Sequence, residues 1–292
     1  MKWNVIKFDT IDSTHDHLYK NGENLSDGTV ATAEFQSAGH GREKRCWIAK
    51  RGSSLLMSML LKPKITIEQA SQISLVLAAS VIKVIAEFSN RHHLTKLSET
   101  NINVGVGPCA DPLRRADTGV CPYKKPNALF LDSLECKEIQ FKWPNDILID
   151  GKKVSGILAQ SSVKGRDLEY VVLSMGLNIG QDEDELIQID RPATSLSLHI
   201  KTLPHKNEIL NLILDRFTED YKSFIQNGLA SSINFLEKHD SLIGKEIVLD
   251  LGTTEFIGIA EGLDQKGLLI IKSRDGKKKS VGCGEIIKVI SV

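Results

Sequence analysis

The sequence predicts an α+β fold in which a β-sheet packed with helices is followed by a small β-barrel. Three observations support this class. Residues 139–179 contain strand-like segments separated by turn signals, which is typical of an antiparallel meander. Residues 67–88 and 208–226 carry apolar side chains at the three- and four-residue steps of helices. After residue 239 the pattern changes to short strands, and about five strands in roughly 50 residues indicate a small barrel.

The N-terminal part is expected to form three strands and one short helix. The strands are residues 3–8, 29–35 and 54–61. Asp12-Ser13-Thr14 offers N-cap side chains for a helix over about 15–20. Residues 37–53 are rich in glycine, lysine and arginine, and we predict a mobile basic loop there.

The helix over residues 67–88 is apolar over most of its surface, so we place it in the core. We end it at Phe88, because residues 89–137 show no strong period and read as an atypical insertion. The Gly-Val-Gly-Pro-Cys stretch at 105–109 lacks the third glycine of a dinucleotide-binding loop. A metal site is not expected, because the candidate ligands lack partners at metal-ligand spacing. These candidates are Cys109, Cys121, His92, His93 and His199.

The second half begins with the predicted meander. A strand at 139–143 ends at Pro144, and Asp150-Gly151 is the strongest hairpin signal in the chain. An amphipathic helix at 208–226 and a shorter helix at about 231–239 follow the meander. The change of pattern near Asp240 predicts two domains, residues 1–239 and residues 240–292.

Composition excludes several classes of protein. The 292 residues are 41% hydrophobic and 25% charged, which is ordinary for a globular chain. The 37 Lys and Arg residues balance 37 Asp and Glu residues, so nothing global attracts the chain to nucleic acid or an anionic membrane. No uninterrupted apolar run reaches the roughly 18 residues of a membrane span. Five scattered cysteines without a CxxC motif suit reduced thiols, so we predict a cytoplasmic protein.

The loop at residues 39–47 is the first candidate for binding chemistry. Its glycines allow an anion to approach the backbone, and Arg42, Lys44 and Arg45 supply positive charge. The loop does not match the GxxxxGK[ST] pattern of a P-loop. Taken alone, it fits a solvated surface loop equally well.

The other candidates lie at strand ends. Lys142 is expected on the sheet face opposite its aromatic neighbours, and Asn145 and Asp146 suit nucleotide or metal–phosphate contacts. In residues 151–158, one of two hairpin lysines is expected to point inward. In residues 174–180, glycines permit the close approach of a ligand. Each of these segments alone also fits an ordinary turn or sheet edge.

Taken in order, these segments resemble a biotin protein ligase. The motifs that carry the resemblance are Ile11–Thr14, Ala33–Arg42, Trp47, Leu56–Met59, Lys142–Asp146, Lys153–Leu158, Gly176–Asn178, Ala193–Leu196 and Phe256–Ile259. Their order and spacing make the resemblance specific, and it covers nearly the whole chain except about 89–137. It implies a mixed β-sheet packed with helices, of the class II synthetase-like or biotin–lipoate ligase-like type, followed by an SH3-like barrel.

The resemblance implies an ATP-dependent biotin–[acetyl-CoA-carboxylase] ligase. Biotin and MgATP would give biotinyl-5′-AMP and pyrophosphate, and the biotin would then pass to a lysine of a biotin carboxyl carrier domain. The carboxylate of biotin and the triphosphate of ATP repel one another, so an enzyme of this kind needs cations that neutralise the charge that develops as it holds the two reactants together. The expected partners are biotin, ATP and the carrier domain, without nucleic acid or membrane, and the resemblance also admits a homodimer.

Site residues are implied position by position. The implied biotin-binding residues are Ser13, Thr14, His15, Gln36, Gly39, His40, Gly41, Arg42, Lys153, Gly156 and Gly176. The implied ATP- and adenylate-binding residues are Trp47, Lys142, Asn145, Asp146 and Asn178. Lys153 and Arg42 take the catalytic roles, with Lys153 beside the biotin carboxylate and the α-phosphate. Magnesium is expected on Asp146 and the ATP phosphates.

The chain departs from the family pattern in its loop. Where the family reads Gly-Arg-Gly-Arg-Arg-Gly, this chain has His40, Glu43 and Lys44 at the first arginine, third arginine and last glycine. These changes remove positive charge at pH 7 and one flexible position, which bears on how firmly the loop retains an adenylate. Nothing resembling a helix-turn-helix precedes Trp3, so a repressor role is not expected.

Two alternatives stay open from the sequence. One is a lipoate-protein ligase or transferase, since some lipoate-handling proteins share the implied catalytic fold. The other is a non-catalytic binder of a small molecule or a carrier domain. Lys142, Asn145, Asp146 and Lys153 together argue against an inactive binder, and the C-terminal barrel argues against lipoate.

Overall fold

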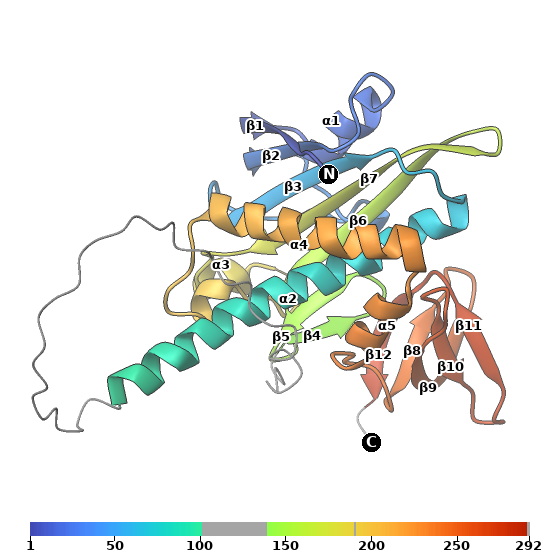
Figure 1. Cartoon of the computed structure of the whole chain (residues 1–292). Coiled ribbons are helices and arrows are strands. Elements are labelled where there is room, and N and C mark those ends of the chain that lie inside the picture. The colour runs from blue at the N-terminus through green and yellow to red at the C-terminus, as the bar shows by residue number, and fades with distance from the viewer. Residues whose placement is uncertain (101–138, 190, 291–292) are drawn as a thin grey trace, which may run out of the picture.

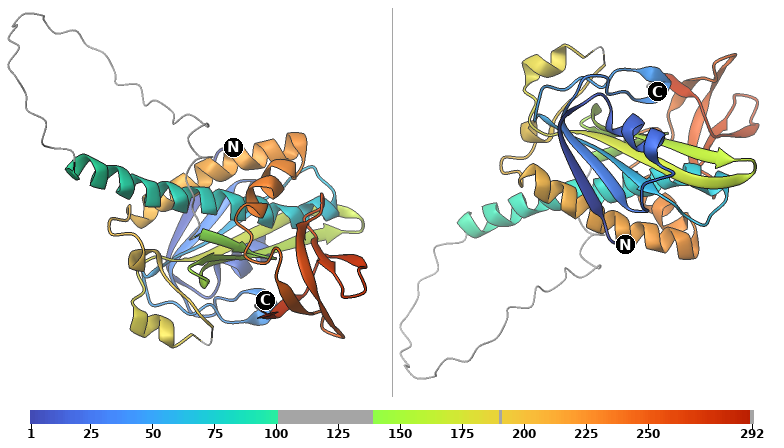
Figure 2. Two further views of the ribbon diagram at one scale, coloured as in Figure 1. Left: turned by 90° about the horizontal axis from the view of Figure 1, so that it is seen from below. Right: turned by 90° about the horizontal axis from the view of Figure 1, so that it is seen from above.

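The computed structural model describes residues 1–100, 139–189 and 191–290 (Figures 1 and 2). The described residues form a seven-stranded mixed sheet with order β1-β2-β3-β7-β6-β5-β4 and a five-stranded sheet near the C-terminus. Helices α2 and α4 pack together along one face of the larger sheet, while α1 lies on the opposite face (Figure 1). This architecture confirms the predicted α+β class and the mixed sheet.

The N-terminal strands follow the predicted pattern. β1 (Asn4–Ile11) runs parallel to β2 (Thr29–Gln36), and α1 (Thr14–Asn21) connects them across the sheet face. Ser13 caps α1, because its side chain accepts a hydrogen bond from Asp16 N and satisfies a free donor of the first turn. β3 (Ser54–Leu61) pairs antiparallel with β2 and is buried along its whole length. Side chains from both its faces therefore reach the protein interior.

Helix α2 (Ile67–Thr100) corrects one sequence prediction. The helix was expected to end at Phe88, but its backbone continues to Thr100. Residues 89–100 contain no proline or glycine, so no helix breaker interrupts the backbone hydrogen bonds. The segment Ile67–Phe88 is long and apolar enough to cross a membrane, yet 78% of its most apolar window is buried inside the protein, as in a core helix. The rest of the predicted insertion, with Cys109 and Cys121, lies outside the described residues.

The predicted meander forms half of the large sheet. Its strands are β4 (Ile139–Lys142), β5 (Asp146–Ile149), β6 (Lys152–Lys164) and β7 (Asp167–Asn178), each antiparallel to the next. Asp150 and Gly151 have φ values of 51° and 73°, as the first hairpin turn requires at both central positions. The structure also contains a short helix α3 (Glu183–Ile187) and a turn of 3₁₀-helix at Leu196–Leu198, neither of which was predicted from the sequence.

The C-terminal part packs onto the larger sheet through its first residues. Helices α4 (Lys206–Asn227) and α5 (Ala230–Glu237) precede it. Its strands are β8 (Glu246–Asp250), β9 (Glu255–Leu263), β10 (Leu269–Lys272), β11 (Lys278–Val281) and β12 (Glu285–Ile290), in the antiparallel order β11-β10-β9-β8-β12. Phe141 N donates to His239 O at 2.8 Å, and Ser241 N donates to Phe141 O at 2.8 Å. These bonds join the two parts at the edge of β4 and bring β12 toward the loop at residues 37–53.

Candidate active site

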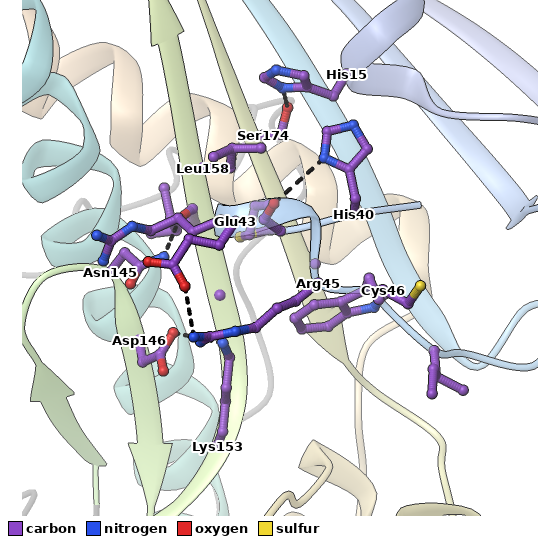
Figure 3. Close-up of a pocket in the computed structure, with 18 of the residues that line it drawn as sticks. His15, His40, Glu43, Arg45, Cys46, Asn145, Asp146, Lys153, Leu158 and Ser174 are labelled. Atoms are coloured by element: carbon purple, nitrogen blue, oxygen red, sulfur yellow. Dashed lines mark hydrogen bonds and ion pairs between the residues drawn. The ribbon is translucent and has the colours of Figure 1, made fainter. Parts of the chain in front are cut away.

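A cavity of about 210 Å³ gathers most of the predicted site residues. It is bounded by the start of α1, the loop at residues 37–53, strands β3, β6 and β7, the β4–β5 turn and the start of β12. Figure 3 places His15 and Ser174 at one end of the cavity and Asp146 and Lys153 at the other. The cavity therefore has one end lined by neutral polar groups and one end lined by charged groups.

The neutral end is built from three adjacent strands, β2, β3 and β7, and the first turn of α1. Thr14 N and Thr14 Oγ1 both donate to Gln36 Oε1, at 2.7 and 2.9 Å. Thr14 Oγ1 is also 2.8 Å from Ser58 Oγ, and Ser58 Oγ is 2.7 Å from Ser174 Oγ. His15 Nδ1 lies 2.7 Å from Ser174 Oγ, and burial lowers the pKa of this imidazole. The result is a continuous set of polar contacts along the cavity wall.

The charged end is built around a lysine and a carboxylate on neighbouring strands. Lys153 Nζ lies 2.6 Å from Asp146 Oδ1, and Asp146 Oδ1 is buried. Lys142 lines the same end, and burial lowers its pKa although Asp146 acts in the opposite direction. Arg42, Arg45 and Arg191 also line the cavity, so its cations outnumber its three carboxylates, Glu43, Asp146 and Glu285. This end is suited to a ligand with several negative charges.

Two predicted binding residues use their amide groups inside the protein. Asn145 Nδ2 donates to Ile157 O at 2.7 Å, which ties the β4–β5 turn to β6. Asn178 Nδ2 donates to Thr194 O at 3.0 Å, and Gln181 Nε2 donates to Asn178 Oδ1 at 2.8 Å. Both residues line the cavity, but their side-chain amides form hydrogen bonds with neighbouring segments of the protein and so stabilise the cavity wall.

Trp47 occupies the space that two glycines leave open. A Cβ on Gly176 would lie 2.4 Å from the Trp47 ring, and a Cβ on Gly156 would lie 3.2 Å from that ring and 2.8 Å from Lys153 Nζ. Lys153 Nζ is 5.7 Å from the centre of the ring, within cation–π range. The buried Trp47 Nε1 has no hydrogen-bond partner among the described residues. In this structure the glycines therefore accommodate an aromatic side chain, which forms a wall of the cavity.

The loop at residues 37–53, which the sequence predicts to be basic and mobile, makes contacts within itself and with α1. His40 and Cys46 form an isolated antiparallel bridge, and residues Arg42–Lys44 form a turn of 3₁₀-helix. His40 Nε2 lies 3.0 Å from Asp16 Oδ1 on α1. Trp47 N donates to Gly39 O at 2.9 Å. The loop therefore folds back on itself and contacts the helix beside the neutral end of the cavity.

The same loop contacts the C-terminal sheet. Arg42 Nη2 donates to Gly284 O at 3.1 Å, and Arg45 donates to Glu285. Arg191 Nη2 lies 2.7 Å from the other oxygen of Glu285. These hydrogen bonds and charges, with that from Arg45 first, lower the pKa of Glu285 and keep it ionised. One carboxylate thus joins the loop and the segment before Thr194 to β12.

The structure brings together nearly every residue that the resemblance assigned to a site. The predicted residues that line the cavity are Ser13, Thr14, His15, Gln36, His40, Gly41, Arg42, Trp47, Lys142, Asn145, Asp146, Lys153, Gly156, Gly176 and Asn178. Gly39 lies just behind the lining, where a Cβ would be 2.6 Å from Gln36 Nε2. Among the described residues no group of three or more His, Cys, Asp or Glu side chains is placed to hold a metal ion.

Several lining residues were missed. Ser58, Arg191 and Glu285 border the cavity, but none was proposed as a binding residue from the sequence. Arg45 and Ser174, which belong to the candidate segments 39–47 and 174–180, also line the cavity, although neither was given an individual role. Ser58 and Ser174 do carry a signal, because each interrupts an otherwise apolar, buried strand. Arg191 and Glu285 carry no such signal, since charged residues in loops and at strand ends are ordinary.

Comparison with known proteins decides the family. The family model described as "Biotin/lipoate A/B protein ligase family" matches residues 7–178, which is more than half of the chain. The chain belongs to the biotin/lipoate A/B protein ligase family. A second model, "Biotin protein ligase C terminal domain", matches residues 242–289. Both matches agree with the resemblance inferred from the motifs.

Known ligases align with most of this chain. The bifunctional ligase/repressor BirA of Bacillus spizizenii is 26% identical over 281 residues, which are 96% of this chain and 72% of the relative. The biotin–[acetyl-CoA-carboxylase] ligase of Paracoccus denitrificans is 25% identical, covering 91% of this chain and 93% of the relative. The biotin protein ligase of Aquifex aeolicus, solved in complex with biotin and ATP, superimposes with a TM-score of 0.68, 25% identity and 97% coverage of both chains.

Proposed function

We propose that this protein is a biotin protein ligase, which activates biotin with ATP and transfers it to a lysine of a carrier domain. One observation carries the proposal most directly. In a chain of this ligase family, a single cavity joins a neutral polar end to a cationic end built around Lys153 and Asp146. A neutral bicyclic head group with an acidic tail and a polyphosphate require these two environments side by side.

The first step joins the two substrates. A carboxylate oxygen of biotin attacks the α-phosphorus of ATP, the bond from that phosphorus to the bridging oxygen breaks, and pyrophosphate leaves with the electron pair. Both reactants are anions, so a cation between them is required for close approach. Lys153 lies at the charged end of the cavity and is proposed for this role. Arg42 and Lys142 add positive charge on the nucleotide side.

The remaining assigned residues bind and orient the substrates. We assign the biotin head group to Ser13, Thr14 and Gln36 at the neutral end, where hydroxyl and amide groups face the cavity. The Trp47 ring provides a flat apolar surface toward the adenylate, supported from behind by Gly176. Asn145 and Asn178 act through the wall that they hold together.

Magnesium would enter with ATP. Mg²⁺ is commonly bound by one or two carboxylates together with substrate phosphates. Asp146 offers one carboxylate beside Lys153, and among the described residues it belongs to no group of three or more His, Cys, Asp or Glu side chains placed to hold a metal ion. The donor set fits a magnesium ion held mainly by the phosphates and fixed to the protein through Asp146. When bound, the ion would neutralise phosphate charge.

The second step uses the activated biotin. A neutral lysine amine of the carrier attacks the carbonyl carbon of the mixed anhydride, the bond to phosphate oxygen breaks, and AMP leaves as the amine loses a proton. The carrier domain of a carboxylase remains the proposed acceptor, by the names of relatives such as the Paracoccus ligase.

The two-domain division is proposed on the same basis. We assign residues 1–239 to catalysis and residues 240–292 to a C-terminal domain, which is supported by the separate sheet from β8 to β12. Its β12 reaches the cavity through Glu285 and Ile286, so this domain contributes to the nucleotide end. A cytoplasmic location and a homodimer stay predictions.

Biotin-dependent exchange of labelled pyrophosphate into ATP tests the proposal. The protein with Mg²⁺ should catalyse exchange with biotin and show none with lipoate. Exchange with lipoate would support the lipoate-ligase alternative. Binding of biotin without any exchange would support the non-catalytic alternative.

A further inference from the structure

Four short contacts connect five side chains along the wall of the neutral end. Their order is Gln36, Thr14, Ser58, Ser174 and His15, and the separations are 2.9, 2.8, 2.7 and 2.7 Å. Thr14, Ser58 and His15 are at most 3% exposed, so bulk water does not replace these contacts. Each contact between two electronegative atoms at such a distance requires one hydrogen between them.

Counting hydrogens fixes the direction of every bond. A hydroxyl donates one hydrogen, so the three hydroxyl groups supply three hydrogens for four contacts. Gln36 cannot supply the fourth, because the oxygen of its amide faces Thr14 and accepts from Thr14 N as well. The hydroxyls must therefore all donate toward Gln36, and the missing hydrogen must come from His15 Nδ1. The count of hydrogens therefore identifies His15 Nδ1 as a donor, which the interatomic distances alone do not show.

If Nδ1 of a neutral His15 ring donates, the other ring nitrogen, Nε2, must be able to accept a hydrogen bond. Its Nε2 lies 2.8 Å from the carboxamide of Gln160, whose oxygen is placed nearer the ring. Burial lowers the pKa of His15, so the neutral ring dominates at pH 7. A neutral ring that donates from Nδ1 must accept at Nε2. Gln160 is exposed and can turn its carboxamide to present NH₂, a choice that ordinary coordinates do not determine.

We propose that His15 is a positioning residue, and that as the Nδ1–H tautomer it completes a one-way relay of hydrogen bonds through Ser174, Ser58 and Thr14 to Gln36. The relay includes Ser58, Ser174 and Gln160, to which no role was assigned from the sequence. In the relay, every hydrogen bond at the neutral end points in one direction, from His15 toward Gln36. His15 itself stays uncharged and takes no part in proton transfer.

The relay determines what the neutral end can recognise. With its oxygen occupied, Gln36 has only N–H donors left for a ligand. Thr14 and Ser174 have each donated their hydrogen within the relay, so each offers only an acceptor oxygen. A cyclic urea, with one carbonyl acceptor flanked by two N–H donors, matches this pattern. This specificity rests on the proposed function, because biotin carries such a urea, whereas the dithiolane ring of lipoate has no N–H donor.

The tautomer can be measured without any ligand. Long-range ¹H–¹⁵N spectra of histidine-labelled protein distinguish a ring protonated at Nδ1 from one protonated at Nε2, and H15N assigns the signal by its loss. We expect Nδ1–H for His15 at pH 7. An Nε2–H ring would overturn the relay.

Two matched substitutions test the role in binding. In H15N the side-chain amide nitrogen can occupy the place of Nδ1 and donate to Ser174, whereas H15L has a similar shape but no donor. We expect H15L to raise the Kd and KM for biotin about tenfold, with a smaller effect on kcat, and H15N to stay within about twofold of wild type. S174A should resemble H15L, while S162A, a serine of β6 that bonds Glu169 away from the relay, should resemble wild type.

The outcomes separate the relay from the proposed function. If H15L binds biotin like wild type, or if H15N is as impaired as H15L, the positioning role is wrong. If wild type shows the Nδ1–H ring but does not bind biotin, the relay stands and the assignment of biotin as ligand fails.

Discussion

Lys153 and Asp146 form a close ion pair at the charged end of the cavity, with Lys153 Nζ 2.6 Å from Asp146 Oδ1. The pair lies across the antiparallel β5–β6 ladder, whose register shifts between Ile147 and Leu148, so the backbone of both strands holds it. Lys152, the preceding residue, is exposed on the opposite side of the strand. The alternation of side chains along β6 thus separates the half-buried Lys153 from the solvated Lys152.

This difference leads to a prediction for exchange activity. K153A should lower biotin-dependent pyrophosphate exchange by about 100-fold or more, because loss of one charge-stabilising group typically has an effect of that size. K152A is the matched control and should keep most of the activity. Comparable loss in both variants would show that general charge near the hairpin matters rather than Lys153.

A second prediction at this scale concerns the glycine behind Trp47. In G176A the new Cβ would lie 2.4 Å from the ring, so Trp47 must move. We expect the KM for ATP to rise about tenfold or more, because the aromatic wall of the nucleotide end is displaced. G180A is the control, since its nearest neighbour would be Ser53 O at 4.0 Å. An unchanged KM in G176A would remove Trp47 from the ATP site.

At the scale of elements, the loop at residues 37–53 is held by its contacts at both ends. His40 contacts Asp16 on α1, while Arg42 and Arg45 contact the start of β12. His40 stands where the family has an arginine, so this chain holds the loop on the α1 side through an imidazole rather than a guanidinium. The loop and the C-terminal sheet are therefore mechanically coupled at the nucleotide end.

Glu285 is the residue that tests this coupling. E285A removes the shared partner of Arg45 and Arg191, so we expect trypsin to cleave the loop several-fold faster, as local opening becomes easier. Mass spectrometry of timed digests would locate cleavage after Arg42, Arg45, Lys50 or Arg51. E255A, which removes an exposed carboxylate at the start of β9, is the control. Equal cleavage rates in wild type and E285A would mean that other contacts hold the loop.

At the scale of the whole molecule, the junction between the two parts contains a buried carboxyl group. Asp240 Oδ1 accepts from Leu242 N at 2.6 Å and from Ile243 N at 3.3 Å, while the buried Oδ2 has no partner among the described residues. Burial raises the pKa of Asp240 to about 6. The group therefore binds a proton more tightly in the folded protein than in the unfolded chain.

The sign of the pH dependence follows from this shift. The stabilisation is fully present below pH 3.8 and is lost as pH rises through about 6, because the buried carboxylate must then carry a charge. D240N keeps the Oδ1 acceptor and removes the ionisation. Above pH 7 we expect D240N to be more stable than wild type by up to about 3 kcal/mol, the equivalent of a shift of roughly two pKa units.

Urea unfolding at several pH values between 5 and 8 measures the effect. The difference in unfolding free energy between D240N and wild type should grow with pH, which separates Asp240 from other groups that titrate in this range. D264N changes a comparable turn-capping aspartate, which bonds Lys266 N and Leu268 N, and should not produce this trend. A difference that does not vary with pH would contradict the assignment.

Elements with local signals could be predicted from the amino-acid sequence. Alternation predicted the strands of the meander, the Asp150-Gly151 pair predicted the hairpin turn, and Ser13 predicted the start of α1. Motif order along the chain was sufficient to identify the family and most lining residues of the cavity. The end of α2 was predicted wrongly, because a loss of amphipathic period was read as a loss of helix although no helix breaker is present.

The tertiary structure alone decided which distant side chains share a hydrogen or a charge. Ser58 and Ser174 are 116 residues apart and become neighbours through the pairing of β3 with β7. Arg45 and Glu285 are 240 residues apart and meet because the C-terminal sheet docks beside β4. Local propensity and periodicity describe the conformation of a segment and which of its faces is buried. They do not describe which segment covers that face, because that depends on the packing of the whole chain.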